Sequence, residues 1–100
     1  MIKHLVMWKL KDMGPKEKQQ AINQMKTGLE ALTGKIDGLV DLQVGADLLQ
    51  SEQSYDVALV STHTSLAALK AYQDHPLHKE AGDTWVKPIA KSRVCVDFEY

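Results

Sequence analysis

The sequence has too few cysteines to stabilise the fold by a disulfide bond and too little net charge to attract a charged partner. Its single cysteine, Cys95, rules out an internal disulfide and fits a reducing compartment. Lysine and arginine number 12 against 13 for aspartate and glutamate, so the formal net charge is only −1. Without a basic field to gather phosphates, we expect no nucleic-acid partner.

Long hydrophobic runs are missing as well. Near the start the longest apolar stretch is Leu5 to Trp8, between Lys3 and Lys9. This is far shorter than a secretion signal or a membrane span requires. We therefore expect no membrane partner and a cytoplasmic location.

The composition is that of one ordinary globular domain spanning residues 1–100, with 44% hydrophobic and 25% charged residues. A domain of this size hides only about 60 to 70% of its unfolded surface, so contact with a partner would add stability. Cys95 lies in an apolar run and is expected to be a buried or half-buried filler.

The spacing of apolar residues predicts a strand, a helix, two strands, a helix and a last strand. Residues 2–10 alternate, which places Ile2, His4, Val6, Trp8 and Leu10 on one face of a strand. The further elements are a helix over 16–33 ended by Gly34, strands over 39–49 and 55–63, a helix over 66–72 capped by Thr64 or Ser65, a helical segment over 77–90 started by Pro76, and a strand over 92–100. Gly28, inside the first helix, suggests close packing against the sheet.

This order indicates an α+β fold: a ferredoxin-like βαββαβ protomer whose antiparallel four-stranded sheet has helices on one face. The other face is expected to carry the polar residues Asp41, Gln43, Arg93, Asp97 and Glu99 around an apolar band of Leu5, Met7, Ala58, Val60 and Cys95. Val94, Val96, Phe98 and Tyr100 then occupy the opposite face of the last strand. An apolar band on so small a domain favours an interface, so we predict a two-fold homodimer through this open face.

The stretch from Ala71 to Glu80, with the sequence AYQDHPLHKE, has two interpretations. In one it merely ends a helix, because Pro76 disfavours helical geometry at the residue before it. In the other, Tyr72 and His78 converge with His4 at one end of the space between helices and sheet. A neutral imidazole can accept a proton there and a phenol can donate to an oxyanion, which suits proton abstraction beside a carbonyl without a cofactor.

A metal site is the weaker alternative for the same stretch. Asp74, His75 and His78 have short, ligand-like spacing, and Asp83 follows. A His-x-x-His pair alone is a frequent chance pattern, and Pro76 separates these two histidines, so no bound metal is predicted. His63, near a strand end, is expected at the surface or as a capping residue.

Three stretches together resemble the stress-responsive A/B barrel domain family, often called Dabb. They are IKHLVMWKLK at the start, AYQDHPLHKEAGD after the second helix and RVCVDFEY at the end. The resemblance covers essentially the whole chain and implies a ferredoxin-like protomer that forms a dimeric α+β barrel. The family includes plant stress-associated proteins, many bacterial proteins and a polyketide cyclase, olivetolic acid cyclase.

In that cyclase a histidine is the base and a tyrosine assists. The resemblance implies that His78 is the catalytic base and Tyr72 the assisting phenol, in a pocket with no cofactor. It implies pocket-lining positions at His4 and His75 and pocket-wall positions at Gly82 and Asp83, and Trp8 shares the strand face of His4. This chain departs from the cyclase at Val57, where the cyclase has a histidine, and its first helix contains no aromatic residue, so the substrate is not transferred.

Three functions therefore stay open. The first is a homodimer with a pocket for a small apolar or polyketide-like ligand, suited to cofactor-independent acid–base chemistry. The second is a non-catalytic stress-related or assembly protein, selected for its stable dimer. The third is a cofactor-independent oxygenase, which occurs among other dimeric α+β barrels.

Overall fold

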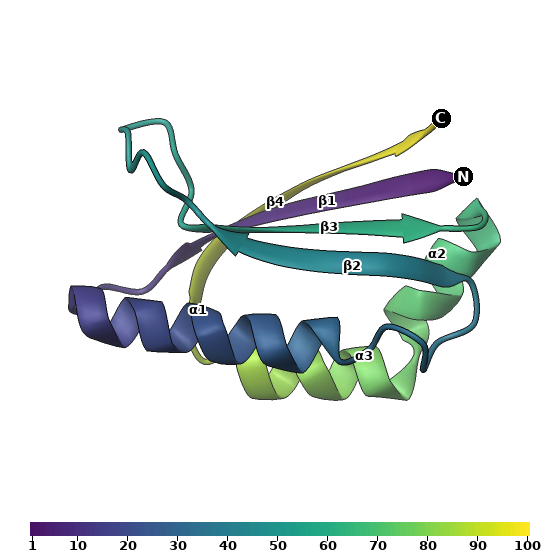
Figure 1. Ribbon diagram of the computed structural model, residues 1–100, viewed down its shortest axis with the longest axis horizontal. Coiled ribbons are helices and arrows are strands. Elements are labelled where there is room, and N and C mark those ends of the chain that lie inside the picture. Colours follow the sequence, from purple (N-terminus) through teal and green to yellow (C-terminus); the bar gives the residue numbers. More distant parts are fainter.

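The computed structural model describes residues 1–100 as a four-stranded antiparallel sheet with helices on one side. The elements are β1 (Ile2–Leu10), α1 (Pro15–Glu30), β2 (Leu39–Ala46), β3 (Val57–His63), α2 (Leu66–Asp74), α3 (Pro76–Ala81), the π-helix η1 (Gly82–Val86) and β4 (Ala90–Glu99). The strands lie in the order β2-β3-β1-β4. All the helices lie beneath one face, and the two termini meet at the same end of the sheet (Figure 1). The predicted ferredoxin-like α+β fold is confirmed.

The helix boundaries follow local signals in the sequence. Pro15 is the first residue of α1, and the Ser65 hydroxyl caps α2 by accepting a hydrogen bond from the Ala68 N–H at 3.1 Å. The helix α2 ends before His75, whose backbone is extended, and Pro76 then begins α3. None of these helices combines the length and the apolar character needed to cross a membrane.

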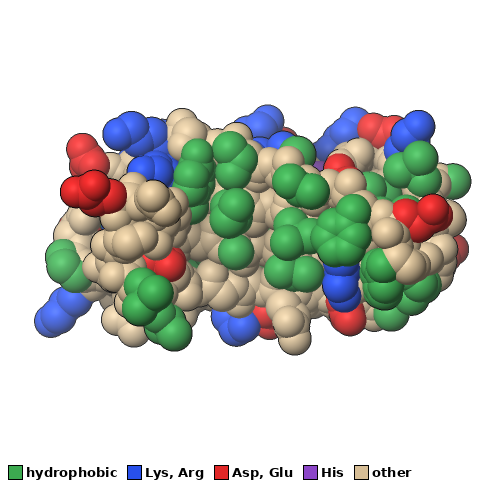
Figure 2. Space-filling view, turned by 90° about the horizontal axis from the view of Figure 1, so that it is seen from above, with side chains coloured by type: hydrophobic (Ala, Val, Ile, Leu, Met, Phe, Trp, Pro, Cys, Tyr) green, Lys and Arg blue, Asp and Glu red, His purple; other side chains and the backbone are tan.

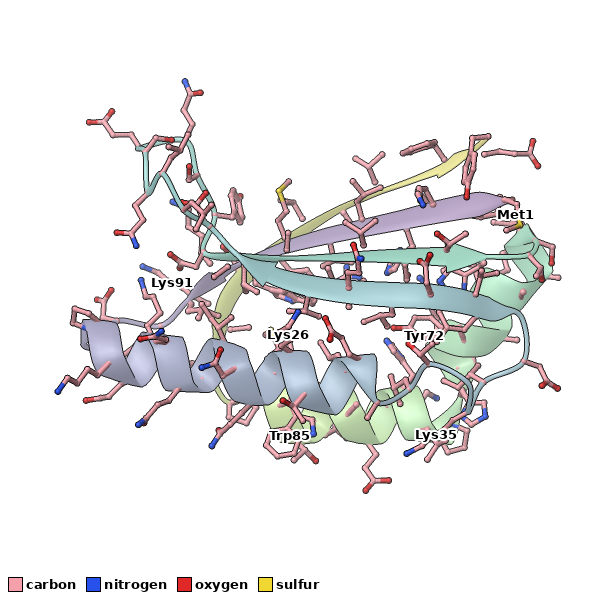
Figure 3. The ribbon with its side chains drawn as sticks, in the orientation of Figure 1. Met1, Lys26, Lys35, Tyr72, Trp85 and Lys91 are labelled. Carbon is pink, nitrogen blue, oxygen red and sulfur yellow. The ribbon has the colours of Figure 1, made fainter.

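The first helix ends earlier than its apolar spacing predicts. It stops at Glu30, and Gly34 lies in the following turn with a φ of 83°, which favours glycine. Gly28 is also explained differently. A Cβ atom at this position would lie 2.3 Å from the indole of Trp85. The glycine is therefore required by close packing against η1, which runs beside α1, and not by the sheet (Figure 3).

Side chains of α1 close the β2 edge of the sheet. The Lys26 ammonium donates to the Val44 carbonyl at 2.9 Å, and the Val44 N–H donates to the Glu30 carboxylate at 3.0 Å. Lys26 also contacts Glu30 at 2.8 Å, and Figure 3 shows Lys26 reaching up from α1 toward β2. One edge of the sheet thus has partners for its backbone groups, whereas β4 forms an exposed edge on the other side.

The face of the sheet opposite the helices is more apolar than the sequence suggested. Met7 pairs with Val94, Leu5 with Val96 and Lys3 with Phe98, so these residues of β4 lie on the open face. The expectation for β4 is therefore reversed: Arg93, Cys95, Asp97 and Glu99 lie on the helix side, across from Trp8, Val6, His4 and Ile2 respectively. Cys95 is exposed instead of buried. Figure 2 shows hydrophobic side chains gathered over the open face.

Candidate functional site

A cavity of about 210 Å³ lies between the sheet and the helices. It is lined by His4, Val6 and Trp8 of β1, Leu29 of α1, Leu59 of β3, Tyr72 of α2, His78 of α3, Gly82 and Val86 of η1, Lys87, and Arg93 of β4. Every layer of the fold therefore contributes to one small space. Aliphatic and indole side chains form most of its wall, with a few polar groups between them, which is the usual make-up of a small-molecule site.

The helix break at His75 brings two aromatic rings together at this cavity. Tyr72 lies near the end of α2 and is buried, and His78 lies in α3, directly after the break. Their ring centroids are 4.4 Å apart, and the ring of His4 lies 6.3 Å from that of Tyr72. Figure 3 shows Tyr72 beneath the sheet, on the side of the helices. Pro76 both ends α2 and makes this contact possible, because it starts a new helix in a different direction.

Hydrogen bonds select the tautomers of the two imidazoles. Nδ1 of His78 lies 3.2 Å from the carbonyl oxygen of Gln73, and Nδ1 of His4 contacts the carboxylate of Asp97. A carbonyl and a carboxylate only accept hydrogen bonds, so each Nδ1 carries the proton and donates it. In both neutral rings Nε2 is then left with a lone pair.

The cavity gives three polar atoms access to a bound molecule. Nε2 of His4, Nε2 of His78 and the Tyr72 hydroxyl make no hydrogen bond to the protein. The one buried side-chain atom that is both unpaired and sealed from solvent is Nδ1 of His63. The three atoms at the cavity thus lack a hydrogen-bond partner in the protein but remain accessible to solvent. Two acceptors and one phenolic donor are therefore free to bind a ligand.

Burial sets the protonation states of the pair at the centre. Desolvation lowers the pKa of His78 below its ordinary value, and the positive charge of Arg93 acts in the same direction, against the Gln73 hydrogen bond. Burial raises the pKa of Tyr72 to about 12, although Arg93 opposes this rise. At neutral pH the site therefore holds an unprotonated imidazole beside a protonated phenol.

A third histidine lies behind these rings. His63 is fully buried, its ring centroid is 4.8 Å from that of Tyr72, and its Nε2 lies 2.8 Å from the Ser61 hydroxyl. Burial lowers its pKa to about 4. The expectation of a surface or capping residue is wrong, because β3 extends through His63 and places it on the same face as Leu59 and Ser61. That alternation was visible in the sequence.

Five of the seven residues expected at the site lie around the cavity: His4, Trp8, Tyr72, His78 and Gly82. Two lie elsewhere. The His75 side chain caps α3, where Nδ1 accepts a hydrogen bond from the Leu77 N–H at 3.1 Å. Asp83 is exposed on η1 and pairs with Lys87 at 2.7 Å. Arg93 and Asp97 were missed as site residues because the sequence placed them on the opposite face of β4.

A larger hollow of about 450 Å³ lies between α1 and the β2–β3 loop. Its ion pair, Lys18 with Asp56 at 3.3 Å, ties α1 to the sheet, and Asp56 also accepts the Leu10 N–H at 2.7 Å. The charged groups of this hollow are therefore engaged in structure. No group of three or more histidine, cysteine, aspartate or glutamate side chains is arranged to hold a metal ion.

Comparison with known proteins decides the family. The model of the stress responsive A/B barrel domain, abbreviated Dabb, matches residues 2–100. The chain belongs to this family. A dimeric protein of unknown function with a ferredoxin-like fold from Bacteroides fragilis is 35% identical, with a TM-score of 0.89 over 99% of this chain and 95% of that one.

Two further solved structures extend the comparison. A dimeric ferredoxin-like protein of unknown function from Thermobifida fusca is 32% identical, with a TM-score of 0.79 over 99% of this chain and 90% of that one. A hydroxynitrile lyase from Passiflora edulis has the same TM-score of 0.79 over 97% of this chain and 90% of that one, at 19% identity. At that identity the lyase is evidence for a shared fold alone.

Proposed function

We propose that this Dabb protein binds a small organic molecule in the cavity and performs cofactor-independent acid–base chemistry on it. The observation that carries the proposal is the contact between the rings of Tyr72 and His78, 4.4 Å apart at their centroids, in opposite protonation roles. Both residues line the cavity, and neither Nε2 of His78 nor the Tyr72 hydroxyl makes a hydrogen bond to the protein. The reaction class is proton abstraction next to a carbonyl, the step that a polyketide cyclase also uses.

In this step His78 is the base and Tyr72 assists. Nε2 of His78 takes a proton from the carbon beside the carbonyl, and the C–H electron pair becomes the double bond of an enolate. The Tyr72 hydroxyl donates a hydrogen bond to the enolate oxygen as negative charge develops there. The imidazolium then returns its proton to the product. His4, held through Nδ1 by Asp97, presents a second acceptor for a substrate hydroxyl.

We propose that the working form is a homodimer joined through the open face. The exposed apolar residues on that face include Met7, Val94, Val96 and Phe98, and Val96 is 63% exposed in the isolated protomer. Large exposed apolar patches mark interfaces. The Bacteroides and Thermobifida relatives are dimeric, which supports the same assembly here.

Deuterium exchange tests the proposed chemistry without knowledge of the natural substrate. The protein is incubated in D₂O with one-ring ketones such as phenylacetone and acetophenone, and deuterium at the carbon beside the carbonyl is followed by NMR. We expect the wild type to accelerate exchange above the buffer rate. His78→Gln should reduce the rate by about 10²-fold or more, and Tyr72→Phe by about 10²-fold.

Matched variants separate chemistry from folding. His75→Asn keeps an oxygen that can cap α3, and Tyr100→Phe removes a phenol outside the cavity, so both should exchange deuterium at the wild-type rate. Exchange by His78→Gln at the wild-type rate would remove His78 as the base. If the folded wild type accelerates exchange of no ketone, the acid–base proposal fails and the structural dimer becomes the better interpretation.

A further inference from the structure

The mouth of the cavity carries one cation that the protein does not neutralise. Arg93 lines the cavity from β4, directly across from Trp8 of β1. Its guanidinium makes no hydrogen bond and no ion pair within the chain, although it offers five donors. Arg93 is exposed, and it also lines the cavity that Tyr72 and His78 line, so its donors are available to a molecule bound there.

The other charges at the site are already paired. Lys87, also at the mouth, contacts Asp83 at 2.7 Å, and Asp97 is bound to Nδ1 of His4. Asp97 lies four residues along β4 from Arg93, a distance of about 13 Å in an extended strand. Arg93 is thus left as the uncompensated charge, and its positive field reaches the proton-transfer pair, since it opposes both the rise in the pKa of Tyr72 and the protonation of His78.

The interior of the cavity limits what the charged group can be attached to. Its wall includes the apolar side chains of Val6, Trp8, Leu29, Leu59 and Val86. The volume of about 210 Å³ exceeds the roughly 150 Å³ of an engineered protein cavity that holds one benzene molecule. A single ring with a short substituent therefore fits, with its polar end at the mouth.

We propose that Arg93 determines substrate specificity by binding a carboxylate, so that the ligand of this cavity is a one-ring organic acid. The planar guanidinium matches a carboxylate with two parallel hydrogen bonds, and the apolar ring lies among the aliphatic and indole side chains. This inference rests on the proposed function in using the same cavity, but it concerns recognition and not proton transfer. Arg93 orients the acid so that its reactive carbon faces Tyr72 and His78.

Binding of a matched pair of probes tests the inference. Phenylacetate and phenylacetamide have nearly the same size and differ in charge, and NMR shift changes at Gly82, His78 and the Arg93 side-chain N–H report occupancy of the cavity. We expect the wild type to bind phenylacetate about tenfold more tightly than the amide. Arg93→Gln should abolish that preference, and Arg93→Lys should retain part of it.

Lys91→Gln is the matched control, because Lys91 is an exposed cation of the same strand outside the cavity. It should keep the wild-type preference, and added salt should weaken the preference in the wild type.

Equal binding of acid and amide by the wild type overturns this inference and leaves the cavity as a ligand site. Inorganic phosphate that shifts Arg93 as strongly as phenylacetate overturns it as well, in favour of unspecific anion binding. If neither ring compound shifts the cavity residues, this inference fails together with the ligand site, which the deuterium-exchange test examines separately.

Discussion

The ring of Tyr72 lies against the ring of His78, with centroids 4.4 Å apart and planes tilted by 50°. The contact joins the last turn of α2 to the first turn of α3 across a break of one residue, His75. Burial acts on both groups but in opposite directions, lowering the pKa of the imidazole and raising that of the phenol. This one ring contact thus places a base and a hydrogen-bond donor side by side.

The Asp97 carboxylate should fix the tautomer of His4. In the wild type, ¹⁵N NMR should find His4 with its proton on Nδ1 at neutral pH, since Asp97 only accepts there. In Asp97→Asn the amide can donate as well as accept, so the form with the proton on Nε2 should appear. We also expect the free energy of unfolding to fall by about 1 kcal/mol, because the lost contact is a charge-assisted hydrogen bond at a partly exposed site.

Glu99→Gln is the control for this variant. Glu99 lies two residues further along the same face of β4, and its side chain makes no hydrogen bond or ion pair. It should leave both the tautomer and the stability of the protein unchanged. An unaltered Nδ1–H signal of His4 in Asp97→Asn would show that Asp97 does not control the ring.

His63 should make the fold sensitive to mild acid. Its pKa is about 4 in the folded protein and 6.5 in a model peptide, so between these values the unfolded chain binds the proton more readily. The stability that neutral His63 provides is complete above pH 6.5 and falls as the pH drops toward 4. By this linkage we expect a loss of about 2 kcal/mol between pH 7 and pH 5 from this residue.

Urea unfolding of the wild type and of His63→Gln at these two pH values measures the contribution. Glutamine keeps a group for the Ser61 hydroxyl but does not titrate, so the variant should lose about 2 kcal/mol less than the wild type. If the variant does not fold, NMR titration of His63 in the wild type gives the same information. A pKa near 6.5 for His63 would contradict the prediction.

Gly28→Ala should destabilise the protein although alanine is the better helix former. The methyl group would lie 2.3 Å from the Trp85 indole, and relieving that overlap should outweigh the gain in helix propensity, for a net loss of about 1 to 2 kcal/mol. Gly82→Ala is the control. Gly82 has helical backbone angles and nothing within 4 Å of its added Cβ, so thermal unfolding should show equal or higher stability. A Gly28→Ala variant more stable than the wild type would mean that Trp85 moves aside at little cost.

Val96→Asp should separate the dimer. Val96 lies on the open face across from Leu5, where an interface would bury the new charge without a partner. Sedimentation at micromolar concentration should give twice the mass of 11.2 kDa for the wild type and the single mass for the variant. Cys95→Asp places the same charge on the other face of β4 and should remain dimeric. A dimeric Val96→Asp protein would exclude the open face as the interface.

The sequence predicted the order of the elements because apolar spacing and proline positions are local signals. The strand β1 and the break at His75 and Pro76 are found where these signals place them. The orientation of β4 was wrong for a physical reason. The rule that apolar residues face inward assigns Val94, Val96 and Phe98 to the core. This sheet has two apolar faces, however, and these three residues lie on the open face.

Because the orientation of β4 was predicted the wrong way round, the sequence did not predict the two charged residues that β4 brings to the site. Once β4 is turned over, Arg93 reaches the cavity and Asp97 reaches His4, and neither follows from a short motif. Pairing between β1 and β4 joins residues about 90 positions apart, as in His4 with Asp97, where |i−j| is 93. Local patterns carry no information on such contacts. Tyr72 and His78, which lie close in the sequence, were by contrast accessible to prediction.

The most direct test of the central claim is the protonation state of His78, measured by ¹⁵N NMR of the folded protein at pH 7. We expect a neutral ring with its proton on Nδ1, bonded to the Gln73 carbonyl, and a titration midpoint below 6.5. Acid should then remove the base as the pH falls through that midpoint. An imidazolium at pH 7, or a neutral ring protonated on Nε2, would contradict the account, because the cavity would contain no base beside Tyr72.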